Sequence, residues 1–136
     1  MVPGGTLAIL PGGSLTLTSG ATVLGTGIIA NAGTLSKTDT TTTTIVPTVV
    51  NTGTISIQAG AVTLSGDSLS SGPISISPNR TLELSNNTHL ISGDVSGNGN
   101  ILVSGGTFVV SGGTYSTGRT GVTGCSLLFS SWATLS

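Results

Sequence analysis

The apolar residues of the chain fall in short runs of Val, Ile and Leu that alternate with Thr and Ser. Alternation with a period of two is typical of half-buried β-strands, because successive side chains of a strand point to opposite faces. Apolar residues two positions apart can therefore point inward together. Examples are Leu15 with Leu17, Ile55 with Ile57, and Leu82 with Leu84. The pattern predicts an all-β protein.

A marker of the form Gly-x-apolar-Ser/Thr recurs every twenty residues, with one slip of a single residue at Gly72. The marker glycines are Gly13, Gly33, Gly53, Gly72, Gly93 and Gly113. The apolar residues of the markers are Leu15, Leu35, Ile55, Ile74, Val95, Tyr115 and Leu135. Two further apolar runs lie in each period, such as Val62–Leu64 with Leu69, and Leu82–Leu84 with Leu90–Ile91. Each period therefore holds three short strands.

Three strands that close on themselves every twenty residues describe one coil of a right-handed parallel β-solenoid. We expect six to seven coils in a single domain over residues 1–136, with the markers spanning roughly 29 Å at about 4.8 Å per coil. The marker apolar residues should form an inward ladder, and the glycines should supply corner backbone angles that other residues adopt only at a cost. Asn31 and Asn51, again twenty residues apart, are expected to stack their side-chain amides at a corner.

One further column follows from the same register. Ser or Thr succeeds the inward residue of each marker and should form a hydroxyl ladder that faces water; its members are Thr16, Ser36, Ser56, Ser96, Ser116 and Ser136. The segment 37–48 has few apolar anchors and predicts an irregular or bulged coil. Its run of threonines can be a low-complexity tract or an ordered strand, and Ile45–Val46 with Val49–Val50 favour the ordered form.

Composition and charge narrow the range of partners. Only 5% of the 136 residues are charged and the net charge is -1, so no basic groove for nucleic acid is expected. No apolar stretch is long enough to cross a bilayer. Residues 1–5 do not resemble a secretory signal, so we expect that one was removed or that the chain is a segment of something longer. The single Cys125 permits neither an internal disulfide nor a cysteine cluster for zinc.

Catalytic chemistry is not expected. His89 is the only histidine, and no nucleophile or carboxylate stands at a useful spacing from it. Asp67, Glu83 and Asp94 fall in three different columns of the twenty-residue register, which favours solvated surface charges over a paired-carboxylate site. We therefore predict no enzyme activity, cofactor or metal.

One end of the chain departs from the repeat. A shift of 120 residues aligns Cys125 and Trp132 with the glycines Gly5 and Gly12. This change fits a specialised terminal coil in which Trp132 anchors a neighbouring molecule, and it fits drift in a degenerate repeat equally well. Val109 and Leu128 are expected to point outward on neighbouring coils and to add a small apolar patch at the same end.

The phrases Asn31–Thr38 (NAGTLSKT) and Asn51–Gly66 (NTGTISIQAGAVTLSG) resemble the repeats of large bacterial secreted and surface proteins. The nearest families are the filamentous-haemagglutinin-like adhesins and the autotransporter passenger domains. The resemblance is one of repeat style and covers most of the chain. It implies a β-helical stalk exposed outside the cell and used for adhesion, matrix or fibre formation.

A solenoid presents unpaired backbone groups at both ends, and neither end of this sequence shows a polar cap. We therefore expect copies to stack end to end into an extracellular or cell-surface filament, or the chain to be one slice of a longer stalk; the partner in the first case is the chain itself. An alternative is a module that binds surface glycans through an exposed aromatic such as Trp132. Ice binding by the hydroxyl ladder is less favoured, because Ser replaces Thr at most positions of that column.

Overall fold

The computed structural model describes residues 5–18, 20, 22–130 and 134–135, and these residues form twenty short strands and no helix. The strands make three sheets, named A, B and C here. Sheet A contains β1 (Thr6–Ile9), β4 (Ile28–Asn31), β7 (Thr48–Asn51), β10 (Ser68–Ser70), β13 (Thr88–Ile91), β16 (Thr107–Val110) and β19 (Ser126–Phe129). Sheet B contains β2 (Ser14–Leu17), β5 (Thr34–Lys37), β8 (Thr54–Ile57), β11 (Ile74–Ile76), β14 (Val95–Ser96), β17 (Thr114–Tyr115) and β20 (Thr134–Leu135). Sheet C contains β3 (Thr22–Val23), β6 (Thr42–Ile45), β9 (Ala61–Leu64), β12 (Thr81–Leu84), β15 (Asn100–Val103) and β18 (Arg119–Val122).

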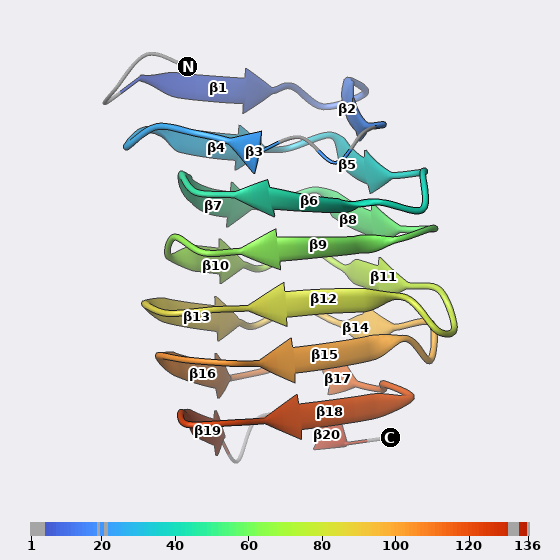
Figure 1. Ribbon diagram of the computed structural model, residues 1–136, viewed down its shortest axis with the longest axis vertical. Helices are drawn as coiled ribbons and strands as arrows, with labels where there is room; N and C mark the ends of the chain where they lie inside the picture. Colours follow the sequence, from blue (N-terminus) through green and yellow to red (C-terminus); the bar gives the residue numbers. More distant parts are fainter. Residues whose placement is uncertain (1–4, 19, 21, 131–133, 136) are drawn as a thin grey trace.

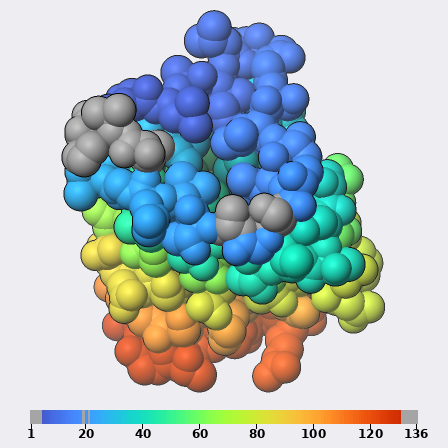
Figure 2. All heavy atoms as spheres, turned by 45° about the horizontal axis from the view of Figure 1, so that its top comes forward, coloured from blue at the N-terminus to red at the C-terminus, as the bar shows by residue number. Residues whose placement is uncertain are grey.

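The chain visits sheets A, B and C in turn, and each strand pairs in parallel with the strand three places along the chain. Figure 1 shows that the front strands β6, β9 and β12 run to the left, and the rear strands run to the right, while the chain descends. The coils are therefore right-handed. In Figure 2 the sequence colours follow one another as bands along the rod. The predicted three-stranded, right-handed β-solenoid with about twenty residues per coil is confirmed.

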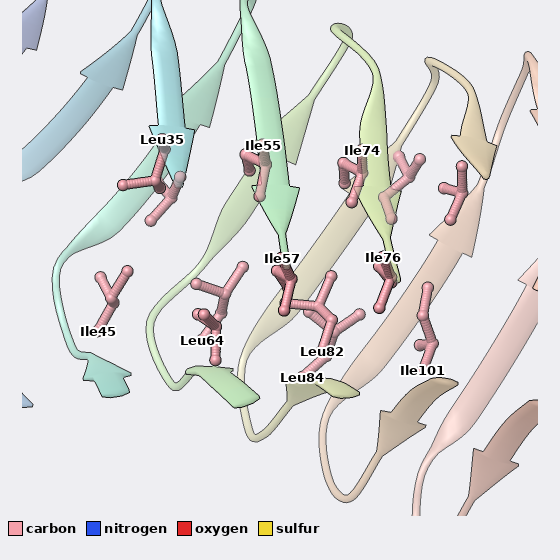
Figure 3. Packing of buried hydrophobic residues seen from close by; sticks show 14 of the residues in the cluster. Leu35, Ile45, Ile55, Ile57, Leu64, Ile74, Ile76, Leu82, Leu84 and Ile101 are labelled. Atoms are coloured by element: carbon pink, nitrogen blue, oxygen red, sulfur yellow. The ribbon is translucent and has the colours of Figure 1, made fainter. Parts of the chain in front are cut away.

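The register of sheet B reproduces the spacing of the sequence markers. Leu35 pairs with Ile55, Ile55 with Ile74, and Ile74 with Val95, so the slip at Gly72 is absorbed by spacings of nineteen and twenty-one residues on the two sides of Ile74. The inward ladder is the result of this alignment, and Figure 3 shows Leu35, Ile55 and Ile74 in one row. Leu64 and Leu82 of sheet C and Ile57, the second inward residue of β8, pack beside this row. Burial of such aliphatic side chains is the main source of stability, at about 1.5–3 kcal/mol for each one.

The predicted ladder residues occupy this core with two qualifications. Leu35, Ile55, Ile74, Val95 and Tyr115 are buried, whereas Leu15 in the first coil is only partly buried against the core. The side chain of Leu135 and all of Ser136 lie outside the described residues. The column after the ladder, from Thr16 to Ser116, is half-buried or exposed, as expected for outward hydroxyl groups.

The threonine-rich segment is ordered. Thr42–Ile45 forms β6, which pairs with β9, and the side chain of Thr43 is buried at an inward position. The preceding corner, residues 38–41, holds four residues, as does the equivalent corner 77–80, whereas the corner 58–60 holds three. The segment therefore forms a regular strand and a corner of ordinary length, and the irregular or bulged coil predicted for it was wrong.

The role predicted for the corner glycines was wrong for most of them. Of the six marker glycines, only Gly113 has a positive φ, of 70°. At Gly53 an added Cβ would lie 2.1 Å from the carbonyl oxygen of Gly33, and similar clashes with backbone atoms arise at Gly33, Gly72 and Gly93. Glycine is required at these four corners because the coils stack backbone against backbone, and not because of an unusual φ.

Candidate assembly interface

The first coil leaves part of its inward column uncovered. Leu7 of β1 occupies the same column as Ile29 and Val49, which are fully buried in the next two coils. Leu7 itself is 42% exposed. Leu15 and Val23, the inward residues of β2 and β3, are also only partly buried. The N-terminal end thus presents core side chains to solvent.

The last described coil shows the same feature in its inward columns. Phe129 lies under Val110 and is 39% exposed, and Val122 lies under Val103 and is 40% exposed, although both residues above them are fully buried. The ring of Phe129 packs edge-on against Tyr115, with 5.3 Å between ring centroids. The C-terminal end therefore exposes an aliphatic and an aromatic side chain in columns that are buried one coil earlier.

Strand edges accompany these apolar ends. Strands β1, β2 and β3 are the outermost strands of their sheets at one end, and β19, β20 and β18 are outermost at the other. Edge strands carry backbone N–H and C=O groups that can pair with another strand. Both ends therefore combine the two features that hold neighbouring coils together inside the rod, namely a parallel backbone ladder and an apolar cross-section.

The predicted lateral patch belongs to a longer feature. Val109 is half-buried and Leu128, paired directly with it, is 55% exposed; Trp132 lies outside the described residues. The outward column that contains the first two is apolar in all seven strands of sheet A, and we name it the apolar stripe. Its members are Ala8, Ala30, Val50, Leu69, Leu90, Val109 and Leu128.

The sequence analysis missed most of this stripe. In β10 the apolar residue points outward and the two serines point inward, which is the reverse of the usual pattern. Leu69 points outward and is 45% exposed, while Ser68 and Ser70 point into the core. The alignment of Leu69 with Val50 and Leu90, nineteen and twenty-one residues away, is the signal that identifies this column.

The core contains a buried hydrogen-bonded chain of polar side chains. Asn31 donates its amide Nδ2 to Asn51 Oδ1 at 2.7 Å, and Asn51 Nδ2 donates to Ser70 Oγ at 2.9 Å. The expected stacking of the two asparagines is present, but inside the rod instead of at a surface corner. An internal cavity of about 10 Å³, lined in part by Asn51, Ser68 and Ser70, lies beside this chain. The small serine side chains leave this space unfilled.

The single histidine is held in the core by two hydrogen bonds. His89 is fully buried, its Nε2–H donates to the Asn86 carbonyl oxygen at 2.9 Å, and the Ser68 hydroxyl lies 2.7 Å from Nδ1. With Nε2 protonated, Nδ1 accepts the hydrogen bond from Ser68 and the ring is neutral. Burial lowers the pKa of His89, and backbone contacts with Ser85 and Asn86 and the charge of Asp67 only partly oppose that effect. The Ser–His contact lies inside the core and is not arranged as an accessible nucleophile.

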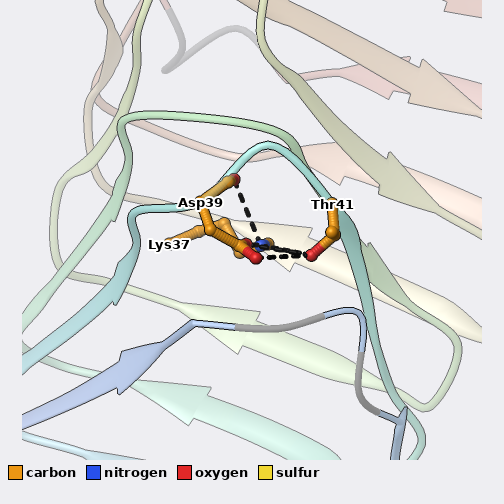
Figure 4. A network of polar contacts seen from close by, with 3 residues as sticks. All are labelled: Lys37, Asp39 and Thr41. Atoms are coloured by element: carbon orange, nitrogen blue, oxygen red, sulfur yellow. Dashed lines mark hydrogen bonds and ion pairs between the residues drawn. The ribbon is translucent and has the colours of Figure 1, made fainter.

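A lysine occupies an inward position between two aliphatic residues. Lys37 lies in the column of Leu17 and Ile57 and its side chain is buried. Figure 4 shows its ammonium group held by the carboxylate and carbonyl oxygen of Asp39 and by Thr41 Oγ1; the last two contacts are each 3.2 Å. Burial lowers the pKa of Lys37. The corner 38–41 thus folds back over the ammonium group and supplies the oxygens that a buried charge needs.

The acidic residues do not form a common site. Asp67 precedes β10 in sheet A, Glu83 lies on β12 in sheet C, and Asp94 precedes β14 in sheet B. Asp67 and Asp94 each accept a hydrogen bond from a backbone N–H of the next coil, those of Thr88 and Thr114. Within the described ranges, no three His, Cys, Asp or Glu side chains could hold a metal ion together. Cys125 is half-buried and its thiol donates to the Val103 carbonyl oxygen.

Sheet C carries a surface hollow near the C-terminal end. It has a volume of about 300 Å³ and is lined by Thr81, Asn100, Ile101, Leu102, Arg119 and Gly121. Thr81, Asn100 and Arg119 follow one another in a single outward column. Gly121, in the next outward column beneath Leu102, has no side chain to fill the space. The hollow therefore combines one guanidinium group, an amide, a hydroxyl and an apolar wall.

Substitution of the two members of the Lys37–Asp39 ion pair should change the free energy of unfolding differently. Asp39→Ala should destabilise the protein by about 3 kcal/mol, because it leaves a buried ammonium group without its counter-charge. Lys37→Met should leave stability unchanged or raise it, since the column is otherwise aliphatic and Asp39 stays partly hydrated. Urea unfolding measures both values. Asp94→Ala, which removes a surface carboxylate with a backbone hydrogen bond, is the matched control and should cost about 1 kcal/mol. Equal losses for Lys37→Met and Asp39→Ala would contradict this account.

The lowered pKa of His89 predicts that acid destabilises the rod. Between the native pKa and the unfolded value of about 6.5, the unfolded chain binds more protons, so the free energy of unfolding falls as the pH falls through this window. The double variant Ser68→Val/His89→Leu continues the apolar column of Val49 and Phe108 and should lose this part of the dependence. Urea unfolding at pH 7.5 and 5.0 compares the two proteins, and identical pH dependence in both would rule out His89 as the source.

Comparison of the chain with protein-family models, with curated proteins and with solved structures found no match. Among the described residues, no helix is long and apolar enough to cross a membrane. The features that remain for a functional inference are the two uncovered ends, the apolar stripe of sheet A and the hollow of sheet C.

Proposed function

We propose that this chain is a structural segment of an extracellular β-solenoid fibre, in which the coils continue beyond both ends through a further copy or through more coils of a longer chain. The observation that supports this proposal is the exposure of Leu7, Val122 and Phe129 in columns whose members in the middle of the rod are buried. A further coil would bury these side chains and pair the edge strands in the same step. The scarcity of charged residues favours close approach, because a net charge of -1 gives little repulsion between copies.

The columns of the two ends are compatible with continuation. With β19 of one copy placed against β1 of the next in the register of the rod, Leu127 meets Leu7 and Phe129 meets Ile9, so apolar residues meet apolar residues. Burial of one such side chain contributes about 1.5–3 kcal/mol. The backbone ladder fixes the rotation of one copy relative to the other, because only one rotation aligns all the sheets.

Sheet C is not continuous across a direct end-to-end junction between two copies. It has six described strands where sheets A and B have seven. Copies that join β19 to β1 and β20 to β2 therefore leave sheet C one strand short at the junction. Further coils of a longer chain would supply that strand, whereas a direct junction between copies of these coils rests on sheets A and B. We expect such direct junctions to be reversible on dilution.

End-to-end association predicts concentration-dependent rods. Sedimentation velocity at several concentrations, together with negative-stain electron microscopy, should show oligomers that lengthen with concentration in the unmodified chain. Leu7→Glu should abolish them, because the junction would bury a carboxylate without a partner. Leu24→Glu is the matched control, since Leu24 lies at a corner between β3 and β4, is exposed, and should leave assembly unchanged.

Two outcomes would contradict the fibre proposal. One is an unmodified chain that stays a monodisperse monomer at the highest concentration, with a melting temperature that Leu7→Glu does not alter. The other is assembly that Leu7→Glu and Leu24→Glu weaken equally. Circular dichroism of each variant verifies that the coils are still folded.

A second candidate function is recognition of an acidic surface glycan, and the hollow of sheet C favours it. Arg119 can pair with the carboxylate of a uronic or sialic acid while Asn100 and Thr81 bond to hydroxyl groups. Arg119→Ala should weaken binding to carboxylated glycans on an array at least about tenfold, which corresponds to the loss of one charge-assisted hydrogen bond. The same glycans without the carboxylate are the control, and equal binding of the two sets would exclude this role for Arg119.

A further inference from the structure

The outward face of sheet A differs in chemistry from the outward faces of the other two sheets. The apolar stripe has an aliphatic residue in every coil from Ala8 to Leu128, and the exposed Ile28 lies on the same face. On sheet B the corresponding column, from Thr16 to Ser116, contains only Ser and Thr. On sheet C it changes from Thr44 through Glu83 to Leu102 and Gly121. Only sheet A therefore presents an uninterrupted aliphatic line along the rod.

We propose that the apolar stripe is a lateral interface through which two rods of this same chain pack with their A sheets face to face. This inference extends the proposed function and rests on it for its strength, because the stripe lengthens with every rod that is added end to end. The result is a paired or bundled fibre in place of a single filament.

The spacing of the residues in the apolar stripe favours a second copy of the chain as the binding partner. One aliphatic side chain appears for each coil, at the strand spacing of about 4.8 Å. A partner that fits the whole line must present apolar groups at the same spacing. The A sheet of a second copy does so, because it has the same column with one aliphatic residue in each coil. Sheets that pack face to face lie about 10 Å apart and interdigitate their side chains, which matches one row of Val and Leu on each side.

One charged residue lies on this face. The outward column of sheet A two residues before the stripe holds Thr6, Ile28, Thr48, Thr88, Thr107 and Ser126. Asp67, which directly precedes Ser68, falls in this column between Thr48 and Thr88, and its carboxylate accepts the backbone N–H of Thr88. The remaining six of the seven charged residues in the sequence lie on sheets B and C or at their corners. Two A faces therefore avoid burying like charges when the rods pack with their Asp67 side chains offset from one another.

The contact area explains why strong lateral association requires a filament. Seven strands at about 4.8 Å and four residues at about 3.3 Å give a face of roughly 440 Å² for each copy, or about 900 Å² for a pair. Stable specific interfaces bury about 1,200 Å² or more, so a pair of single copies should associate only weakly. The buried area grows in proportion to the number of copies joined end to end, and lateral association becomes strong in long rods.

The test uses the double variant Leu69→Thr/Leu128→Thr, which converts two exposed stripe residues to the residue type of the outer face of sheet B. Electron microscopy should show paired or bundled rods for the unmodified chain and single rods of the same length for the variant. Leu102→Thr is the matched control, because Leu102 points outward on sheet C, and it should leave the bundles intact. Single rods from the unmodified chain, or bundles that persist in the double variant, would overturn the proposal.

A second measurement separates this proposal from the end-to-end one. In the Leu7→Glu background, where axial stacking is blocked, sedimentation equilibrium should detect a weak dimer with a Kd on the order of 1 mM, because the area lies below that of stable specific interfaces. Addition of Leu69→Thr/Leu128→Thr should remove that dimer. If the unmodified chain forms no filaments, this dimer still supports the lateral contact and the fibre proposal alone fails. A Leu7→Glu chain that stays monomeric to the limit of its solubility would overturn the lateral contact.

Discussion

The parallel backbone ladder between successive coils is the constraint on which the rest of the structure depends. It places each residue over its counterpart about twenty positions away and holds the two backbones near 4.8 Å apart. At the corners this spacing leaves no room for a side chain, which is why Gly53 lies directly under Gly33. Along the strands it turns individual residues into columns, so that the chemistry of a face is decided column by column and not residue by residue.

The same constraint explains how polar groups are accommodated in a core only three short strands wide. Asn31, Asn51 and Ser70 form a hydrogen-bonded chain because the ladder stacks them at hydrogen-bonding distance along the axis, which leaves only Asn31 Oδ1 of this chain without a partner among the described residues. His89 likewise finds Ser68 in the coil above it. Lys37 has aliphatic residues above and below, and its partners come instead from the adjacent corner of its own coil. A polar residue in this core therefore requires a partner in the next coil or a corner that folds back over it.

The twenty-residue markers were sufficient to predict the fold and the ladder of sheet B, because these depend on repeat length and period-two alternation; the handedness followed from the right-handed preference of parallel crossovers. The phase of β10 was not predicted, since a strand with Ser68 and Ser70 inward and Leu69 outward reverses the usual pattern, and a shift of one residue changes the face of every side chain. The inward position of Lys37 could have been found from Leu17 and Ile57, which stand twenty residues on either side. The steric role of Gly53 depends on the distance between coils, which no property of a single repeat reveals.

The two apolar surfaces differ in how their strength depends on the size of the assembly. The end surface is limited to one cross-section of the rod, so the free energy of each axial junction is the same in a short rod and in a long one. The stripe of sheet A gains area with every copy added, because each coil contributes one more aliphatic residue. A rod of a few copies already exceeds the area that stable interfaces require. Axial growth should therefore come first and lateral pairing second, and the fibre should thicken only after it has lengthened.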